Sequence, residues 1–122
     1  MSGIALWLAV GALGGCGAIA RFLVDELVSA RVAGRFPVGT LAVNLSGSAL
    51  LGLLAGLALT GDALLLAGTA LLGSYTTFST WMLDSSELRE HDHRGLLALN
   101  LAGSLLFGLA SVALGRALGG AL

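Results

Sequence analysis

The chain has 122 residues, of which 57% are hydrophobic and only 11% are charged, less than half of the roughly 25% that soluble domains carry. A water-soluble domain of this size needs charged side chains over most of its surface, so this composition excludes an ordinary soluble fold. The net charge of -1 comes from six Arg and seven acids, with no Lys and no basic cluster. Nucleic acid is therefore excluded as a partner, because nothing would hold its phosphate backbone.

Four long segments of the chain contain no charged residue. About 20 apolar residues in a helix span the roughly 30 Å hydrocarbon core of a bilayer. The charge-free segments are residues 4–20, 37–61, 63–83 and 95–115. The sequence therefore predicts an all-α membrane protein embedded in a lipid bilayer, with one domain over residues 1–122. We place its four transmembrane helices at residues 4–30, 38–60, 63–84 and 95–118.

The first predicted helix contains two residues with a candidate role. Cys16 is the only cysteine, so no intrachain disulfide can form, and a small apolar packing role explains it best. Arg21 directly follows the charge-free part of the helix. A lone arginine near a helix end usually extends its charge to the membrane interface. The alternative is a fixed positive charge at the mouth of a pore.

Small and weakly polar residues recur at every third or fourth position along the second and fourth predicted helices, so each series forms a stripe on one face. Such stripes are typical of packing seams in which an Asn amide bonds a neighbouring helix, but they also suit a polar track. The second helix carries Asn44, Ser48, Gly52 and Gly56, and the fourth carries Asn100, Ser104, Gly108, Ser111 and Gly115.

The two stripes lie in similar sequences. Residues 41–53 (LAVNLSGSALLGL) align with residues 97–109 (LALNLAGSLLFGL), and nine of thirteen positions are identical. This match indicates a duplicated two-helix hairpin. Duplication of an even number of helices preserves their direction, so inverted symmetry would require a second subunit inserted in the opposite orientation.

The third predicted helix contains the densest polar segment of the chain. Six of the seven side chains in residues 74–80 (SYTTFST) carry hydroxyls, and the segment follows Gly73 at the middle of a charge-free stretch. Glycine and paired β-branched threonines are poor helix formers. We expect the helix to break at mid-membrane, where freed carbonyls would be offered to a cation. The alternative is an unbroken helix whose hydroxyls bond carbonyls in the preceding turn.

The loop at residues 84–94 combines four acids, two arginines, His91 and His93. A His-x-His pair among acids could bind a metal, but a solvated loop explains this composition better. No nucleophile, base and orienting group gather at useful spacing anywhere in the chain. The sequence therefore predicts a protein that is not an enzyme.

Four segments of the chain form a specific combination, in which a TTFST core follows a glycine, with an Asn in the second helix and an Arg after the first. The segments are GGCGAIARF (14–22), GTLAVNLSGSALLG (39–52), GSYTTFSTW (73–81) and NLAGSLLFG (100–108). Together they resemble the bacterial fluoride channels, the Fluc or CrcB family of small four-helix membrane proteins. The resemblance covers nearly the whole chain.

The resemblance implies a fluoride-selective passive channel in the bacterial plasma (inner) membrane, which exports fluoride from the cytoplasm and lowers its toxicity. It also implies an antiparallel dual-topology dimer with two fluoride pores and a structural, non-transported sodium ion (Na+) at its centre. In the family, backbone carbonyls that correspond to Gly73 and Thr76 bind the sodium, and Arg21 matches the family's arginine. The implied pore residues are Asn44, Phe78, Trp81, Thr77, Ser104 and Asn100.

Three residues depart from the family pattern: Ser74 stands where a second glycine is usual, Trp81 replaces a second Phe, and Met82 replaces a serine. The arginines are also uneven, which bears on how the subunits insert. A homodimer and an obligate heterodimer with a homologous partner therefore both remain open. Four arginines lie in the loops on one side and one lies on the other: Arg31, Arg35, Arg89 and Arg94 against Arg116.

Two other classes of membrane protein are alternatives. A small proton-coupled multidrug exporter needs a carboxylate inside its first helix, and residues 1–21 contain none. A purely structural membrane protein would explain the glycine stripes, but it has no need of six hydroxyls beside Gly73. The sequence favours the channel.

Overall fold

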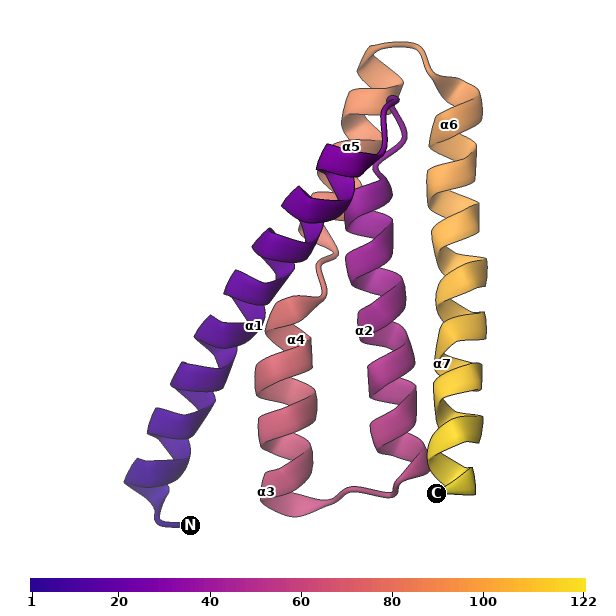
Figure 1. The fold of residues 1–122 in the computed structure, drawn as a ribbon. Helices are drawn as coiled ribbons and strands as arrows, with labels where there is room; N and C mark the ends of the chain where they lie inside the picture. Colours follow the sequence, from indigo (N-terminus) through magenta and orange to yellow (C-terminus); the bar gives the residue numbers. More distant parts are fainter.

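The computed structural model describes all 122 residues as helices joined by short turns, with no β-strand. Four helical runs alternate in direction, so that both termini and α3 lie at one end and the turn between α5 and α6 lies at the other (Figure 1). The prediction of an all-helical chain with four helices is confirmed. The first two runs are α1 (Gly3–Arg31) and α2 (Val38–Gly56). The third contains α3 (Gly61–Leu64), the π-helix η1 (Leu65–Leu72), α4 (Gly73–Tyr75) and α5 (Ser79–Glu90), and the fourth contains α6 (Arg94–Ala98), the π-helix η2 (Leu99–Gly103) and α7 (Ser104–Ala121).

Three of the four runs are long and apolar enough to cross a membrane. They are Gly3–Arg31, Val38–Gly56 and Arg94–Ala121, with mean hydropathies of 1.8, 1.6 and 1.9. The third run is longer than the helix expected at residues 63–84, because it begins at Gly61 and α5 continues to Glu90. It is interrupted at residues 76–78, within the segment where the sequence predicts a break. Neither of its parts alone reaches the roughly 20 residues that a bilayer core requires.

The second helix ends at Gly56, earlier than the expected residue 60. The reason is a left-handed residue: Ala58 has φ of 55°, which an α-helix cannot continue through. The Leu59 N–H then donates to the Leu54 carbonyl at 3.3 Å, which satisfies a carbonyl of the last turn.

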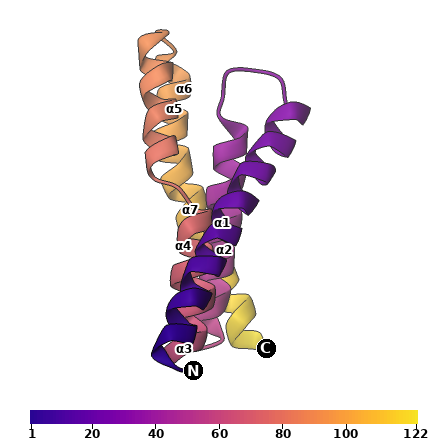
Figure 2. The ribbon, with the colours of Figure 1, turned by 90° about the vertical axis from the view of Figure 1, so that its left-hand side faces the viewer.

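Helix α1 begins at a side-chain cap and leans across the third run. The Ser2 hydroxyl accepts a hydrogen bond from the Ala5 N–H at 3.2 Å, as an N-cap serine does. Figures 1 and 2 show α1 crossing the run that contains α4 at an angle. At the crossing, Gly17 packs against the Leu71 carbonyl and the Ser74 side chain so closely that an added Cβ would collide with both.

Helices α2 and α7 lie side by side and pack through glycine (Figure 1). A Cβ added to Gly52 would collide with the Val112 carbonyl of α7, and one added to Gly115 would collide with the Ala49 carbonyl of α2. Gly119 approaches the main chain of α2 in the same way. Small residues allow such backbone contact between membrane helices. The packing interpretation therefore accounts for the glycines at the C-terminal ends of both stripes.

Most of the large apolar side chains are exposed on the outer surface of the protomer. Only 15 of 122 residues are buried, which is too few for a chain that would face water. Large side chains on α1 and α7 stand free, among them Trp7 at 76% exposure, Leu106 at 68% and Phe107 at 59%. Apolar faces of this extent need lipid or another subunit to cover them.

We predict that Gly115→Ala lowers the temperature at which the detergent-solubilised protein unfolds. The new methyl group would push α7 away from the main chain of α2, and overpacking of this kind costs about 1–3 kcal/mol. Gly120→Ala is the matched control, because it lies in the same helix and an added Cβ there meets nothing within 4 Å. Size-exclusion chromatography after heating measures the midpoint, and equal midpoints for the two variants would contradict the close contact.

Candidate functional site

The third helical run is interrupted between α4 and α5. Thr76 leaves the helix with φ of -77° and ψ of 157°, an extended conformation, and helix resumes at Ser79. The interruption begins three residues after Gly73, which starts α4, and falls on the paired threonines, which are poor helix formers. Figure 1 shows this segment as a thin, unwound connection between α4 and α5.

The Asn44 side chain on α2 holds this interruption through two hydrogen bonds. Its Oδ1 accepts from the Thr77 N–H at 2.8 Å, and its Nδ2 donates to the Thr77 carbonyl at 2.8 Å. A primary amide offers a donor and an acceptor in one plane, so it can satisfy both main-chain groups of one residue. We call this pair of bonds the Asn44–Thr77 clamp. It supplies partners that the broken helix does not.

The interruption also takes the usual hydrogen-bond donors away from two carbonyls. In a continuous α-helix the Thr77 N–H would donate to the Gly73 carbonyl and the Thr80 N–H to the Thr76 carbonyl. In the structure the Thr77 N–H donates to Asn44, and the Thr80 N–H donates to the Thr77 hydroxyl at 3.1 Å. The usual helical donors of Gly73 and Thr76 are thus diverted, which leaves lone pairs of the kind that unwound membrane helices present to sodium.

Most hydroxyls of this segment bond within the third run, whereas the Tyr75 hydroxyl bonds Ser46 Oγ on α2 at 2.8 Å. Ser74 Oγ donates to the Ala70 carbonyl at 2.7 Å and Thr76 Oγ1 to the Leu72 carbonyl at 3.1 Å. Such bonds to carbonyls of the preceding turn were expected for the alternative in which the helix is unbroken. The interruption and this back-bonding therefore occur together. The Thr77 hydroxyl caps the first turn of α5 through its bond from the Thr80 N–H.

Two grooves lie on either side of Asn44, Ser48 and Trp81, which line both. The first, with a volume of about 240 Å³, we call the Phe78 groove, and the second, of about 280 Å³, the Ser104 groove. No charged residue lines either one. The other residues of the Phe78 groove are Leu51, Thr76, Thr77 and Phe78. Those of the Ser104 groove are Ser104, Leu105, Gly108, Leu109 and Val112.

The structure brings most of the predicted pore residues together in these grooves. Asn44, Thr77, Phe78 and Trp81 share the Phe78 groove, and Ser104 lies in the other. Phe78 is 69% exposed. The rings of Phe78 and Trp81 meet edge to face, with centroids 5.6 Å apart and planes at 82°. The grooves therefore combine neutral hydrogen-bond donors with aromatic rings.

Asn100 lies behind Trp81, outside both grooves. It is 1% exposed, and its main-chain carbonyl accepts from the Trp81 indole N–H at 3.1 Å. Its Nδ2 donates to Ser85 Oγ at 2.9 Å, and that hydroxyl donates to the Trp81 carbonyl at 2.8 Å. Sequence reasoning missed Ser85, whose one signal is its place a helical turn after Trp81, between Asp84 and Ser86.

Arg21 does not join this group within one protomer. It is half-buried on α1 and lines neither groove. A role at a pore mouth would therefore require surfaces beyond those that a single protomer places around Asn44.

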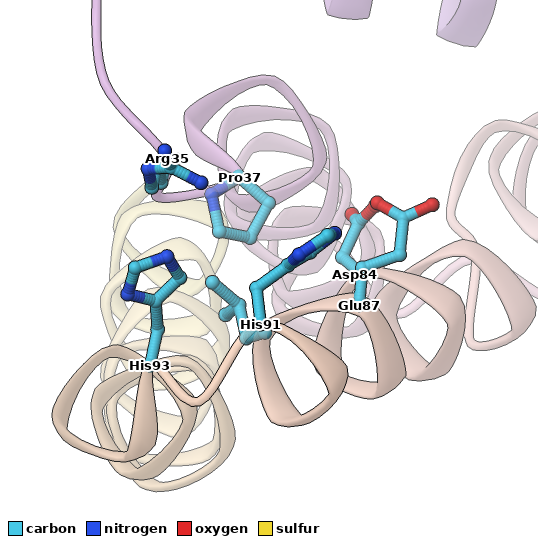
Figure 3. Close-up of a pocket in the computed structure, with 7 residues that line it drawn as sticks. Arg35, Pro37, Asp84, Glu87, His91 and His93 are labelled. Carbon is cyan, nitrogen blue, oxygen red and sulfur yellow. The ribbon is translucent and has the colours of Figure 1, made fainter.

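A separate polar pocket lies at the loop end of the molecule (Figure 3). In Figure 3 the carboxylates of Asp84 and Glu87 lie together on one side, and His93 lies toward Arg35 on the other. Thr40 donates to Asp84 at 2.7 Å, which joins the start of α2 to α5. No group of three or more His, Cys, Asp or Glu side chains is placed to hold a metal ion.

Comparison with known proteins gives consistent matches over nearly the whole chain. Residues 8–116 match the family described as CrcB-like protein, Camphor Resistance (CrcB). A protein of Mycobacterium tuberculosis named fluoride-specific ion channel FluC 2 is 51% identical over 113 residues, which cover 93% of this chain and 90% of that protein. A protein of Symbiobacterium thermophilum named fluoride-specific ion channel FluC 1 is 47% identical, with coverages of 93% and 96%.

We predict that Asn44→Ala speeds deuterium exchange at the Thr77 amide by roughly tenfold, because a buried main-chain pair left without partners costs about 1–3 kcal/mol. Mass spectrometry of peptides covering residues 72–80 measures the exchange. Ser48→Ala is the control, since Ser48 lies one turn along α2 and lines the same grooves. Unchanged exchange in Asn44→Ala, or an equal rise in Ser48→Ala, would show that the clamp does not hold the interruption.

Proposed function

The chain belongs to the CrcB-like protein family, and we propose that it forms a passive, fluoride-selective channel that carries fluoride out of the bacterial cytoplasm. The observation that carries this proposal is the meeting of Asn44, Thr77, Phe78 and Trp81 in one uncharged groove beside an interrupted helix. The names of relatives that are 47% and 51% identical over more than nine-tenths of the chain support fluoride as the ion.

The side chains of the two grooves suit a small anion. Fluoride is strongly hydrated, and its loss of water on entering a membrane must be offset by other donors. The Asn44 amide and the Ser48 and Ser104 hydroxyls are neutral donors at the groove walls. Aromatic ring edges carry partial positive charge and can attract an anion weakly enough to release it. Both features favour passage rather than tight binding.

A structural sodium ion is the second part of the proposal. The residues fit it, because the carbonyls of Gly73 and Thr76 have lost their usual helical donors to Asn44 and Thr77. Carbonyl oxygens from unwound membrane helices are suitable sodium ligands. A bound sodium would supply fixed positive charge near the anion path. Two carbonyls per protomer make an incomplete shell, so a second subunit would contribute the same pair.

The dimer that we propose is antiparallel, with the two subunits inserted in opposite orientations. The extensive exposed apolar surface requires a cover, and a second subunit seated on part of it would close the grooves against lipid. The ends of α1 and α5 lie at the same end of the protomer (Figure 1). Four arginines therefore gather there, namely Arg31, Arg35, Arg89 and Arg94.

This gathering of arginines bears on the identity of the second subunit. Because four arginines lie on this side and one, Arg116, lies on the other, the chain is expected to insert mainly in one orientation. An antiparallel dimer would then need a homologous partner that inserts in the opposite orientation. Relatives carry numbered names, FluC 1, FluC 2 and FluC 3, as expected where one organism has several such chains. A homodimer and a heterodimer both remain proposals, and both place the multi-pass chain in the bacterial plasma membrane.

The two alternatives explain the grooves less well. A proton-coupled exporter needs a titratable carboxylate on its transport path, whereas neither groove contains an acid. A structural membrane protein would use the glycine contacts between α2 and α7 but would not need an interrupted third helix. The channel explains both the uncharged donors and the interruption.

The direct test is fluoride efflux from liposomes that contain this chain in sodium buffer, measured with a fluoride electrode. We expect release of trapped fluoride without ATP and with no dependence on a proton gradient. The same measurement is repeated with a homologous chain from the same organism co-expressed. Efflux only with that partner would establish the heterodimer, and no efflux in either preparation would refute the channel function.

We further predict that removal of sodium lowers both the dimer fraction and the fluoride efflux, because the carbonyls at the interruption would lose their cation. Light scattering on the detergent-solubilised protein measures the dimer, with potassium at equal ionic strength as the control for screening. Dimer fraction and efflux that do not change when sodium is replaced by potassium would contradict a structural sodium ion.

A further inference from the structure

Trp81 brings a hydrogen-bond donor to a groove wall. Its indole N–H is a donor that cannot also accept, and an N–H free to point into the groove would hold an anion more firmly than a ring carbon edge does. The direction of the indole N–H therefore decides whether an anion in the groove contacts the N–H of Trp81 or a carbon edge of its ring.

In the structure the indole N–H points away from the grooves. It donates to the main-chain carbonyl of Asn100 at 3.1 Å. Asn100 is 1% exposed and lines neither groove. The only donor of the Trp81 side chain is thus taken up on the buried side of the ring, while the ring itself lines both grooves.

Further bonds fix this arrangement. The Asn100 side chain donates to Ser85 at 2.9 Å, and Ser85 donates to the Trp81 carbonyl at 2.8 Å. With the indole bond they form a network that joins α5 to η2, and Ser104 Oγ at the wall of the Ser104 groove donates to Asn100 Oδ1 at 3.5 Å. Swinging the indole outward would leave the buried Asn100 carbonyl without this bond. The π-helix η2 (Leu99–Gly103) carries Asn100, and such segments frequently occur at functional sites.

We propose that Trp81 is a positioning residue, held by Asn100 and Ser85 so that fluoride meets its ring carbon edge and never its N–H. The proposal rests on the proposed channel function and explains how a tryptophan can stand in an anion path without trapping the anion. In this arrangement Ser85, which touches neither groove, acts on the ion through Trp81.

The test is nuclear magnetic resonance of the intact protein labelled with ¹⁵N-tryptophan, in sodium buffer. The chain has two tryptophans, so Trp7→Phe assigns the two indole signals. We expect the Trp81 indole N–H to exchange slowly with deuterium and to keep its chemical shift as fluoride is added. A shift that saturates with fluoride would overturn the proposal, because the N–H would then contact the anion.

Ser85→Ala provides the second measurement. Loss of one buried hydrogen bond should speed exchange of the Trp81 indole N–H about fivefold and make its chemical shift respond to fluoride. Ser86→Ala is the matched control, since Ser86 is the next residue, is exposed and takes no part in the network. Equal behaviour of the two variants would overturn the role of Ser85, even if the wild-type signal stayed fixed.

Fluoride efflux from liposomes of the same preparations separates this proposal from the function on which it rests. If the wild-type protein shows efflux and its Trp81 N–H responds to fluoride, the channel function is supported and only the positioning role of Trp81 is refuted. If the wild-type protein shows no efflux, both the channel function and the positioning role are refuted.

Discussion

The structure depends on the Asn44–Thr77 clamp. A helix that is interrupted within a membrane leaves main-chain N–H and C=O groups without partners, and each such group costs several kcal/mol in a bilayer. Asn44 satisfies both groups of Thr77 at 2.8 Å, so residues 76–78 can leave the helix at little cost. The bond from the Thr77 N–H to Asn44 leaves the Gly73 carbonyl without its usual donor, and the Thr77 hydroxyl takes the Thr80 N–H from the Thr76 carbonyl. The Asn44 amide thereby stabilises the interrupted helix and, together with the Thr77 hydroxyl, frees the two carbonyls that we propose as sodium ligands.

The rest of the fold keeps the clamp in place. Gly47, three residues after Asn44 on α2, packs so closely against Thr76 and Tyr75 that an added Cβ would collide with the Thr76 side chain, and this contact holds Asn44 beside Thr77. Main-chain contact at Gly52 and Gly115 fixes α2 against α7. The grooves on either side of Asn44 contain donors and aromatic rings but no charge. An uncharged path has no group that could move protons, which suits passive flow. In the proposed channel, a sodium ion at the Gly73 and Thr76 carbonyls would supply the positive charge that offsets the anion.

The first helix, expected at residues 4–30, spans Gly3–Arg31. Its end is not marked by charge, because the helix continues through Arg21, Asp25 and Glu26. The end of α2 depends on the left-handed Ala58, which no sequence signal marks. Gly73 and the paired threonines indicated the interruption. The partner of Thr77, however, lies 33 residues away on another helix, and only the register between α2 and the third run brings Asn44 to it. The network of Asn100, Ser85 and Trp81 was missed for the same reason.

We propose that the Asn44–Thr77 clamp supports fluoride passage as well as dimer formation. The most direct test is fluoride efflux by Asn44→Ala in liposomes, with the dimer fraction measured on the same sample so that efflux is compared per dimer. We expect dimeric Asn44→Ala to release fluoride about tenfold or more slowly than the same amount of dimeric wild-type protein, because about 1–3 kcal/mol of hydrogen bonding along the path is lost. Wild-type efflux from a dimeric Asn44→Ala protein would contradict it and would leave Asn44 with a packing role only.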